Sequence, residues 1–109
     1  MEHTFETLEI SVHEPKITVV MMNRPAALNA MNTQMMRELR DVFQEFYVDP
    51  STANCVVLTG AGDRGFCSGA DLKERDGMTD ATWKRQHAIV EQLIRNMFNC
   101  PVPIIAAVN

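Results

Sequence analysis

The glycine-rich stretch from Gly60 to Gly69 holds four of the chain's five glycines. Its first part, Gly60 to Gly65, matches the pattern G-x-G-x-x-G that binds a dinucleotide pyrophosphate. Such a site needs its third glycine in the first turn of a helix, and the residues after Gly65, Phe-Cys-Ser, open a helix poorly. It also needs an acidic residue at the end of the next strand, whereas Asp80 is expected to cap a helix. We interpret the stretch as a loop, and a nicotinamide or flavin site is the alternative.

The overlapping stretch from Gly65 to Gly69 resembles a nucleophile elbow in which Cys67 takes the place of serine. An elbow needs a strand that runs directly into it, a helix after it and a downstream histidine. The apolar strand pattern ends several residues before Cys67, and His87 is the only histidine that follows. We therefore interpret Cys67 as a small buried apolar side chain, and a cysteine hydrolase is the alternative.

The third pattern, from Gly69 to Lys73, offers backbone groups instead of side chains. Gly69 allows a ligand to approach the backbone closely, and the small side chain of Ala70 leaves that approach open. Free N–H groups at the start of a short helical turn stabilise an oxygen that gains negative charge. Lys73 adds a cation for a phosphate-bearing ligand. The alternative is a capping turn in which the Asp71 side chain binds its own backbone.

Composition limits the partners of this chain. A length of 109 residues, a net charge of −4 and a hydrophobic content of 46% predict one domain at most, not a disordered tail. Fourteen acidic against ten basic residues argue against a nucleic-acid partner. The longest apolar run, Cys100 to Val108, is shorter than the ~20 residues that cross a membrane. Three cysteines without a Cys-x-x-Cys spacing indicate reduced thiols, no metal site and a cytoplasmic location.

Hydrophobic periodicity predicts the elements that must position these loops, in the order β-β-α-β-α-β of an α/β fold. The expected elements are strands over residues 8–12, 17–22, 55–59 and 104–108, helices over 33–48 and 79–98, and a short helical turn over 71–74. Asn32 is the expected N-cap of the first long helix, and Thr79 or Asp80 that of the second.

Each long helix has an apolar stripe at helical spacing. On the first helix the stripe comprises Met35, Met36, Leu39, Val42, Phe43, Phe46 and Tyr47, and on the second Trp83, His87, Val90, Ile94 and Met97. We interpret His87 as a core or interface histidine, and the acidic run Asp71, Glu74 and Asp76 as a solvated loop.

Five blocks in this order give the chain a family resemblance. They read NRPAALNA from Asn23, a Met-bearing amphipathic helix, VVLTG from Val56, FCSGADLK from Phe66 and PIIAAVN from Pro103. Together they resemble the enoyl-CoA hydratase/isomerase (crotonase) superfamily over essentially the whole chain. Ser68 stands where that family often has alanine, which is a departure that barely changes the size of the side chain.

The resemblance implies an acyl-coenzyme A thioester substrate, with coenzyme A as part of the substrate and no separate cofactor. It places the first backbone donor of an oxyanion hole on the N–H of Ala70. It also implies a substrate-binding role for two segments, whose members are Ala26, Ala27 and Leu28 in the first and Ser68, Gly69, Ala70, Asp71, Leu72 and Lys73 in the second.

The same resemblance implies a crotonase-like (ClpP-type) spiral of β-β-α units, incomplete in this chain. We expect residues 1–109 to be the N-terminal portion of a crotonase-like core domain, with the second oxyanion donor and the acid and base carboxylates beyond Asn109. Hydration of a 2-enoyl-CoA is the expected reaction. Isomerisation, hydrolysis or decarboxylation of an acyl-CoA, or a non-catalytic acyl-CoA-binding or assembly role, are alternatives. A homotrimer or a dimer of trimers is the expected assembly.

Overall fold

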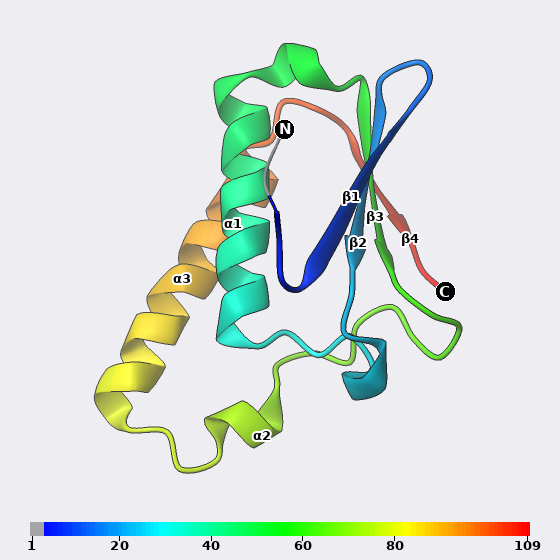
Figure 1. The fold of residues 1–109 in the computed structure, drawn as a ribbon. Helices are drawn as coiled ribbons and strands as arrows, with labels where there is room; N and C mark the ends of the chain where they lie inside the picture. The colour runs from blue at the N-terminus through cyan, green and yellow to red at the C-terminus, as the bar shows by residue number, and fades with distance from the viewer. Residues whose placement is uncertain (1–3) are drawn as a thin grey trace.

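A computed structural model describes residues 4–109 as two layers, in which two long helices cover one face of a four-stranded sheet (Figure 1). The strands are β1 (Leu8–His13), β2 (Ile17–Met22), β3 (Cys55–Gly60) and β4 (Ile104–Ala107). The helices are α1 (Thr33–Val48), α2 (Leu72–Arg75) and α3 (Asp80–Phe98), with 3-10 turns η1 (Pro25–Ala27) and η2 (Pro50–Thr52). The predicted element order and α/β class are confirmed, and the boundaries agree within one or two residues.

The sheet has the order β1-β2-β3-β4. Strands β1 and β2 form an antiparallel hairpin, and β2, β3 and β4 run parallel. The parallel register pairs Met22 with Gly60 and Thr59 with Ala107. Because the carboxyl ends of parallel strands meet at one edge, the loops after β2 and β3 start side by side. Open α/β sheets bind their ligands at this edge.

Helix α1 supplies more of the buried apolar residues that the structure describes than any other element. Asn32 caps it as predicted, since its side chain accepts a hydrogen bond from the Met35 N–H at 2.9 Å. Met35, Phe43 and Phe46 are at most 1% exposed, and burying side chains of this size contributes about 1.5–3 kcal/mol each. Tyr47 was predicted on the same stripe but is 58% exposed. Its place at the edge of the stripe, in the last turn of α1, turns the ring away from the sheet.

The predicted buried face of α3 is wrong for three of its residues. The buried residues of α3 are Gln86, Ile89 and Leu93, whereas Trp83 and Ile94 are 43% and 46% exposed. His87 is exposed as well; its ring stacks on Trp83 and its Nε2 lies 3.1 Å from Oε1 of Glu91. Hydrophobic spacing selected the more apolar face, but tertiary packing buries the adjacent face, where Gln86 finds hydrogen-bond partners.

Buried Glu38 of α1 fixes the segment that leads into β1. Its carboxylate accepts hydrogen bonds from the N–H groups of Glu6 and Thr7, both at 2.8 Å, and from the Thr7 hydroxyl. Burial favours a raised pKa for Glu38, but these hydrogen bonds outweigh it and lower the pKa below its usual value. The side chain is therefore charged at neutral pH although it is only 6% exposed.

Candidate functional site: a groove at the carboxyl edge of the sheet

An open groove of about 550 Å³ lies between the loop after β2 and the segment that leads into α2, and in Figure 1 both lie below the sheet. Of the nine residues predicted to bind substrate, eight line it, and Gly69 is the exception. The lining residues are Arg24, Ala26, Ala27, Leu28, Ala30, Arg64, Ser68, Ala70, Asp71, Leu72 and Lys73. Two segments far apart in sequence thus form one surface. The substrate role of these residues stays a prediction.

The loop after β2 is held by Asn29. Its side chain accepts from the Arg24 N–H at 2.8 Å and donates to the carbonyl oxygens of Ala61 and Gly65, both at 3.0 Å. Asn29 is fully buried and has a φ of 55°, a left-handed conformation that asparagine tolerates better than most residues. These bonds connect the η1 loop to the loop after β3, so the position of the η1 loop beside the groove is fixed.

Ala70 lies opposite Met31 in an isolated parallel bridge. The Met31 N–H donates to the Gly69 carbonyl at 2.8 Å, and the Asp71 N–H donates to the Met31 carbonyl at 3.0 Å. In this pattern the neighbours of Ala70 make both bonds, so its own N–H points away from Met31. Among residues 4–109, the Ala70 N–H donates no hydrogen bond. The groove therefore contains an unused backbone N–H at Ala70, the position that was singled out from the sequence.

Asp71 occupies the amides at the start of α2. Its Oδ1 accepts from the N–H groups of Lys73 at 3.0 Å and of Glu74 at 3.2 Å. The capping turn considered from the sequence is therefore present, and the Ala70 N–H lies outside it, two residues before the helix. The Glu74 N–H, helped by the Arg24 guanidinium, holds the pKa of Asp71 below its usual value despite an opposing effect of burial.

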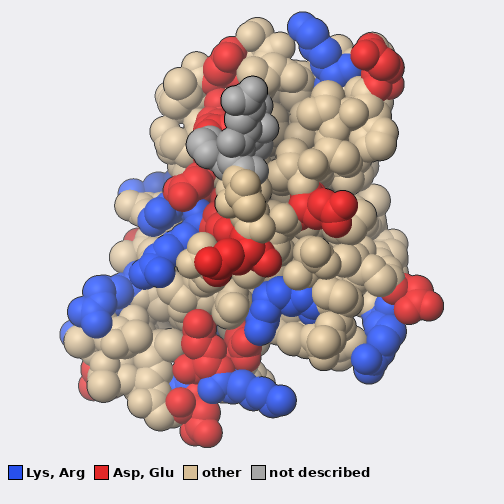
Figure 2. Space-filling model, in the orientation of Figure 1, with Lys and Arg blue, Asp and Glu red and all other residues tan. Residues whose placement is uncertain are grey.

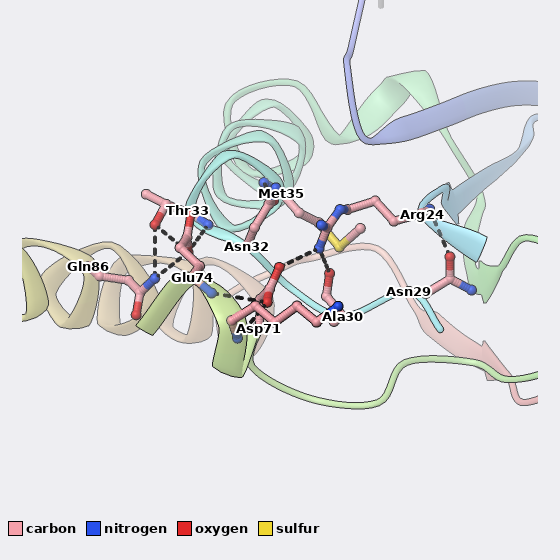
Figure 3. A network of polar contacts seen from close by, with 10 residues as sticks. Arg24, Asn29, Ala30, Asn32, Thr33, Met35, Asp71, Glu74 and Gln86 are labelled. Atoms are coloured by element: carbon pink, nitrogen blue, oxygen red, sulfur yellow. Dashed lines mark hydrogen bonds and ion pairs between the residues drawn. The ribbon is translucent and has the colours of Figure 1, made fainter. Parts of the chain in front are cut away.

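Arg24 connects the two segments. Its Nη1 lies 3.1 Å from Oδ2 of Asp71 and donates to the Ala30 carbonyl at 2.6 Å (Figure 3). Hydrogen bonds between charged groups are roughly twice as strong as neutral ones. The pair therefore joins the two segments that line the groove.

Two further cations, Arg64 and Lys73, line the groove with exposed side chains. Within the described part of the chain, neither side chain forms an ion pair or a hydrogen bond. Figure 2 shows both signs of charge spread over the face in view, and the net charge of the chain is −4. Because Arg64 and Lys73 are unpaired among the described residues, the groove is locally basic although the chain is acidic. A locally basic groove suits an anionic ligand. Arg64 was not selected from the sequence, because only the path of the loop brings it to the groove.

The structural role of Glu74 was also missed from the sequence, because Glu74 was interpreted as part of a solvated loop. Its Oε1 accepts from the N–H and the hydroxyl of Thr33 and from Nε2 of Gln86, each at 2.8 Å (Figure 3). The available signal was the unsatisfied N–H at the first residue of α1, which needs an acceptor. Sequence spacing could not say that the acceptor comes from α2.

The two alternative sites fail on geometry. After Gly65 the chain continues as a loop, and the next helix begins at Leu72, so Gly60 to Gly65 lacks the helix that a dinucleotide site needs. Cys67 is a half-buried free thiol that packs against the core. His87 is engaged by Trp83 and Glu91, and no contact between His87 and Cys67 is present among the described residues.

Residues 4–109 contain neither a cluster of metal ligands nor a helix that could span a membrane. No group of three or more His, Cys, Asp or Glu side chains is arranged to hold a metal ion. No helix in this part of the chain combines the length and the apolar character needed to cross a bilayer.

The sequence and the fold of this chain are similar to those of known proteins. A short-chain-enoyl-CoA hydratase of Clostridium acetobutylicum is 38% identical over 96 residues, which is 88% of this chain and 36% of the relative. A 1,2-epoxyphenylacetyl-CoA isomerase of Escherichia coli is 34% identical over 100 residues, which is 88% of this chain and 37% of the relative. The chain thus spans well under half the length of these curated relatives.

Solved structures with the same fold are also known. The crystal structure of an enoyl-CoA hydratase from Bacillus anthracis matches with a TM-score of 0.88 and 28% identity, covering 95% of this chain and 40% of that one. The crotonase-like fold is confirmed in the part that this chain contains. The family model for enoyl-CoA hydratase/isomerase matches residues 13–109. The chain therefore belongs to the enoyl-CoA hydratase/isomerase family, as the order of its sequence blocks predicted.

Proposed function

We propose that this chain supplies the acyl-CoA-binding part of an enoyl-CoA hydratase-type enzyme, which adds water to a 2-enoyl-CoA. The observation that supports this best is the unpaired Ala70 N–H in a groove lined by the predicted substrate residues. Relatives of similar identity include both a hydratase and an isomerase. Binding and polarisation of the thioester are therefore the common part of the proposal, and hydration is its specific part.

The proposed chemistry centres on the thioester oxygen. When water adds to C3 of a 2-enoyl-CoA, electrons move through the conjugated system and the carbonyl oxygen becomes enolate-like. A backbone N–H directed at that oxygen stabilises the charge without reorganisation, and one such donor contributes about 3–4 kcal/mol in comparable sites. Arg64 and Lys73 then provide cations for the phosphate groups of coenzyme A. A cytoplasmic location and a homotrimer or dimer of trimers belong to the same proposal.

The test compares two four-carbon ligands, of which only crotonyl-CoA has the thioester carbonyl and the double bond conjugated to it. Crotonyl-CoA carries the thioester oxygen, whereas S-butyl-CoA replaces the carbonyl with a methylene and keeps the coenzyme A portion. In ¹⁵N-labelled chain, we expect crotonyl-CoA to move the Ala70 amide proton downfield and S-butyl-CoA to leave it nearly unchanged. Both ligands should shift resonances of Arg64 and Lys73. An Ala70 amide that responds equally to both ligands would contradict the proposal.

A further inference from the structure

Residues at and just before the start of α1 hold the segment that carries Ala70. Met31 contributes two backbone hydrogen bonds, to Gly69 and from Asp71. Thr33 contributes two more, both to the Glu74 carboxylate. Ala70 therefore lies in a segment that is attached to the same helix start on its two sides, and its N–H direction depends on both attachments.

Glu74 is the side chain on which the second attachment depends. One of its oxygens accepts three hydrogen bonds, two from Thr33 and one from Gln86 of α3. Gln86 is only 3% exposed, and it donates to the Thr33 hydroxyl as well, at 2.8 Å. The carboxylate also lies at the positive N-terminal end of α1, where negative charge is favoured. A single carboxylate oxygen of Glu74, which belongs to α2, thus connects α2 to both α1 and α3.

A hydrogen bond to the thioester oxygen tolerates little displacement. Such bonds weaken steeply as the donor angle falls, and a misplacement of about 1 Å in a site can cost about a hundredfold in rate. Apart from the two attachments to the start of α1, the Arg24–Asp71 ion pair also holds segment 69–74, whereas Leu72 is 75% exposed and Lys73 is exposed. The capping bonds of Asp71 stay within the segment and cannot orient it relative to α1.

We propose that Glu74 is a positioning residue for the thioester site, which acts by holding the Ala70 N–H in line with the substrate oxygen. This inference rests on the proposed function. It differs from a general stabilising role, because it predicts a selective loss of the carbonyl-dependent part of binding. Contacts to coenzyme A through Arg64 and through the η1 loop do not depend on Glu74.

The test is the ratio of the dissociation constants for S-butyl-CoA and crotonyl-CoA, measured by calorimetry on the 109-residue chain. Glu74→Ala is expected to reduce this ratio by about tenfold, because the hydrogen bond to the thioester oxygen, which gains negative charge, is lost. If the wild-type ratio is below about ten, the variant should bring it to one. Binding of S-butyl-CoA should change less than about twofold. Asp76→Ala removes an exposed carboxylate nearby and is the matched control, for which the ratio stays at its wild-type value.

Two further variants test the proposal if Glu74→Ala unfolds the chain. Gln86→Glu places a second carboxylate against Glu74 and should lower the ratio through repulsion. The double variant Glu74→Gln with Gln86→Glu restores one amide and one carboxylate, and should regain most of the ratio. A wild-type ratio in Glu74→Ala, an equal loss of affinity for both ligands, or no recovery in the double variant would overturn the proposal. If the wild-type ratio is unity, the proposed function itself has failed, independently of Glu74.

Discussion

Arg24 and Asp71 form an ion pair of 3.1 Å between side chains that are 24% and 15% exposed. Arg24 follows β2 and Asp71 precedes α2, so the pair joins the two segments that line the groove. The same guanidinium nitrogen binds the Ala30 carbonyl, which fixes the arginine on its own loop before it reaches Asp71. Partial burial makes this pair more than a screened surface contact. The shape of the groove is therefore coupled to the charge of Asp71.

That coupling predicts a pH dependence of stability. The pKa of Asp71 lies below its usual value of 3.8, chiefly because the Glu74 N–H and Arg24 favour the charged form. A depressed pKa in the folded state contributes stability above the unfolded pKa and loses it as pH falls through the folded pKa. The difference in unfolding free energy between wild type and Asp71→Asn should be constant at about pH 5–7 and shrink below about pH 4. Urea melts measure it, and a difference that grows with acidity would contradict the assignment.

Replacement of Ala70 by proline tests the backbone donor. Ala70→Pro removes the N–H and also restricts Gly69, which has a φ of +105°. We expect it to abolish the preference for crotonyl-CoA over S-butyl-CoA. Ala70→Gly keeps the N–H and is the matched control, with a preference close to wild type. A full thioester preference with proline at this position would rule out the oxyanion assignment.

Truncation of Glu38 should destabilise the attachment of the N-terminal segment. Glu38→Ala leaves the buried donors of Thr7 without an acceptor, at a cost of about 2–4 kcal/mol in unfolding free energy. Glu38→Gln keeps an acceptor oxygen and should lose less. Denaturant melts with an unchanged slope measure the difference. Equal stability of the alanine and glutamine variants would show that the hydrogen bonds contribute nothing.

Two glycines of the G-x-G-x-x-G pattern should respond differently to alanine. A Cβ at Gly60 would lie 2.3 Å from the Phe66 carbonyl oxygen and 2.7 Å from Nδ2 of Asn29, so Gly60→Ala should cost about 2–4 kcal/mol. A Cβ at Gly65 meets nothing within 4 Å, and Gly65→Ala should stay within about 0.5 kcal/mol. Thermal unfolding compares them, and similar losses in both variants would contradict this account of the loop.

The 109-residue chain is expected to show no hydratase turnover on crotonyl-CoA. Among the described groove residues, Asp71 has the only carboxylate, and it is held by Arg24 and by two backbone N–H groups. Its lowered pKa makes it a weak base, and general base catalysis needs a free group with a pKa near the working pH. Product analysis by chromatography measures turnover, with the related Clostridium acetobutylicum hydratase as positive control. A rate above the buffer blank would refute this expectation.

Local residue patterns were sufficient for the elements of this fold. The alternation in β1, the continuous run in β2, the Asn32 cap and the stripe of α1 each depend on residues close in sequence, so their physical basis can be recognised without the fold. The segment from Gly69 to Lys73 was also selectable, because a glycine and a small residue before a capping aspartate are a local pattern. The order of five such blocks identified the family, which the match over residues 13–109 confirms.

Contacts between distant segments determined the rest. The buried face of α3 depends on which partners Gln86 meets, and those partners, Thr33 and Glu74, belong to other helices. The Ala70 N–H is free because Met31 forms its hydrogen bonds with the backbone of Gly69 and Asp71, on either side of Ala70. Hydrophobic periodicity measures the average polarity of a helix face, whereas burial of a polar side chain depends on whether specific partners satisfy it. That condition is set by the packing of whole elements, which is why the groove and the role of Glu74 emerged from the folded chain.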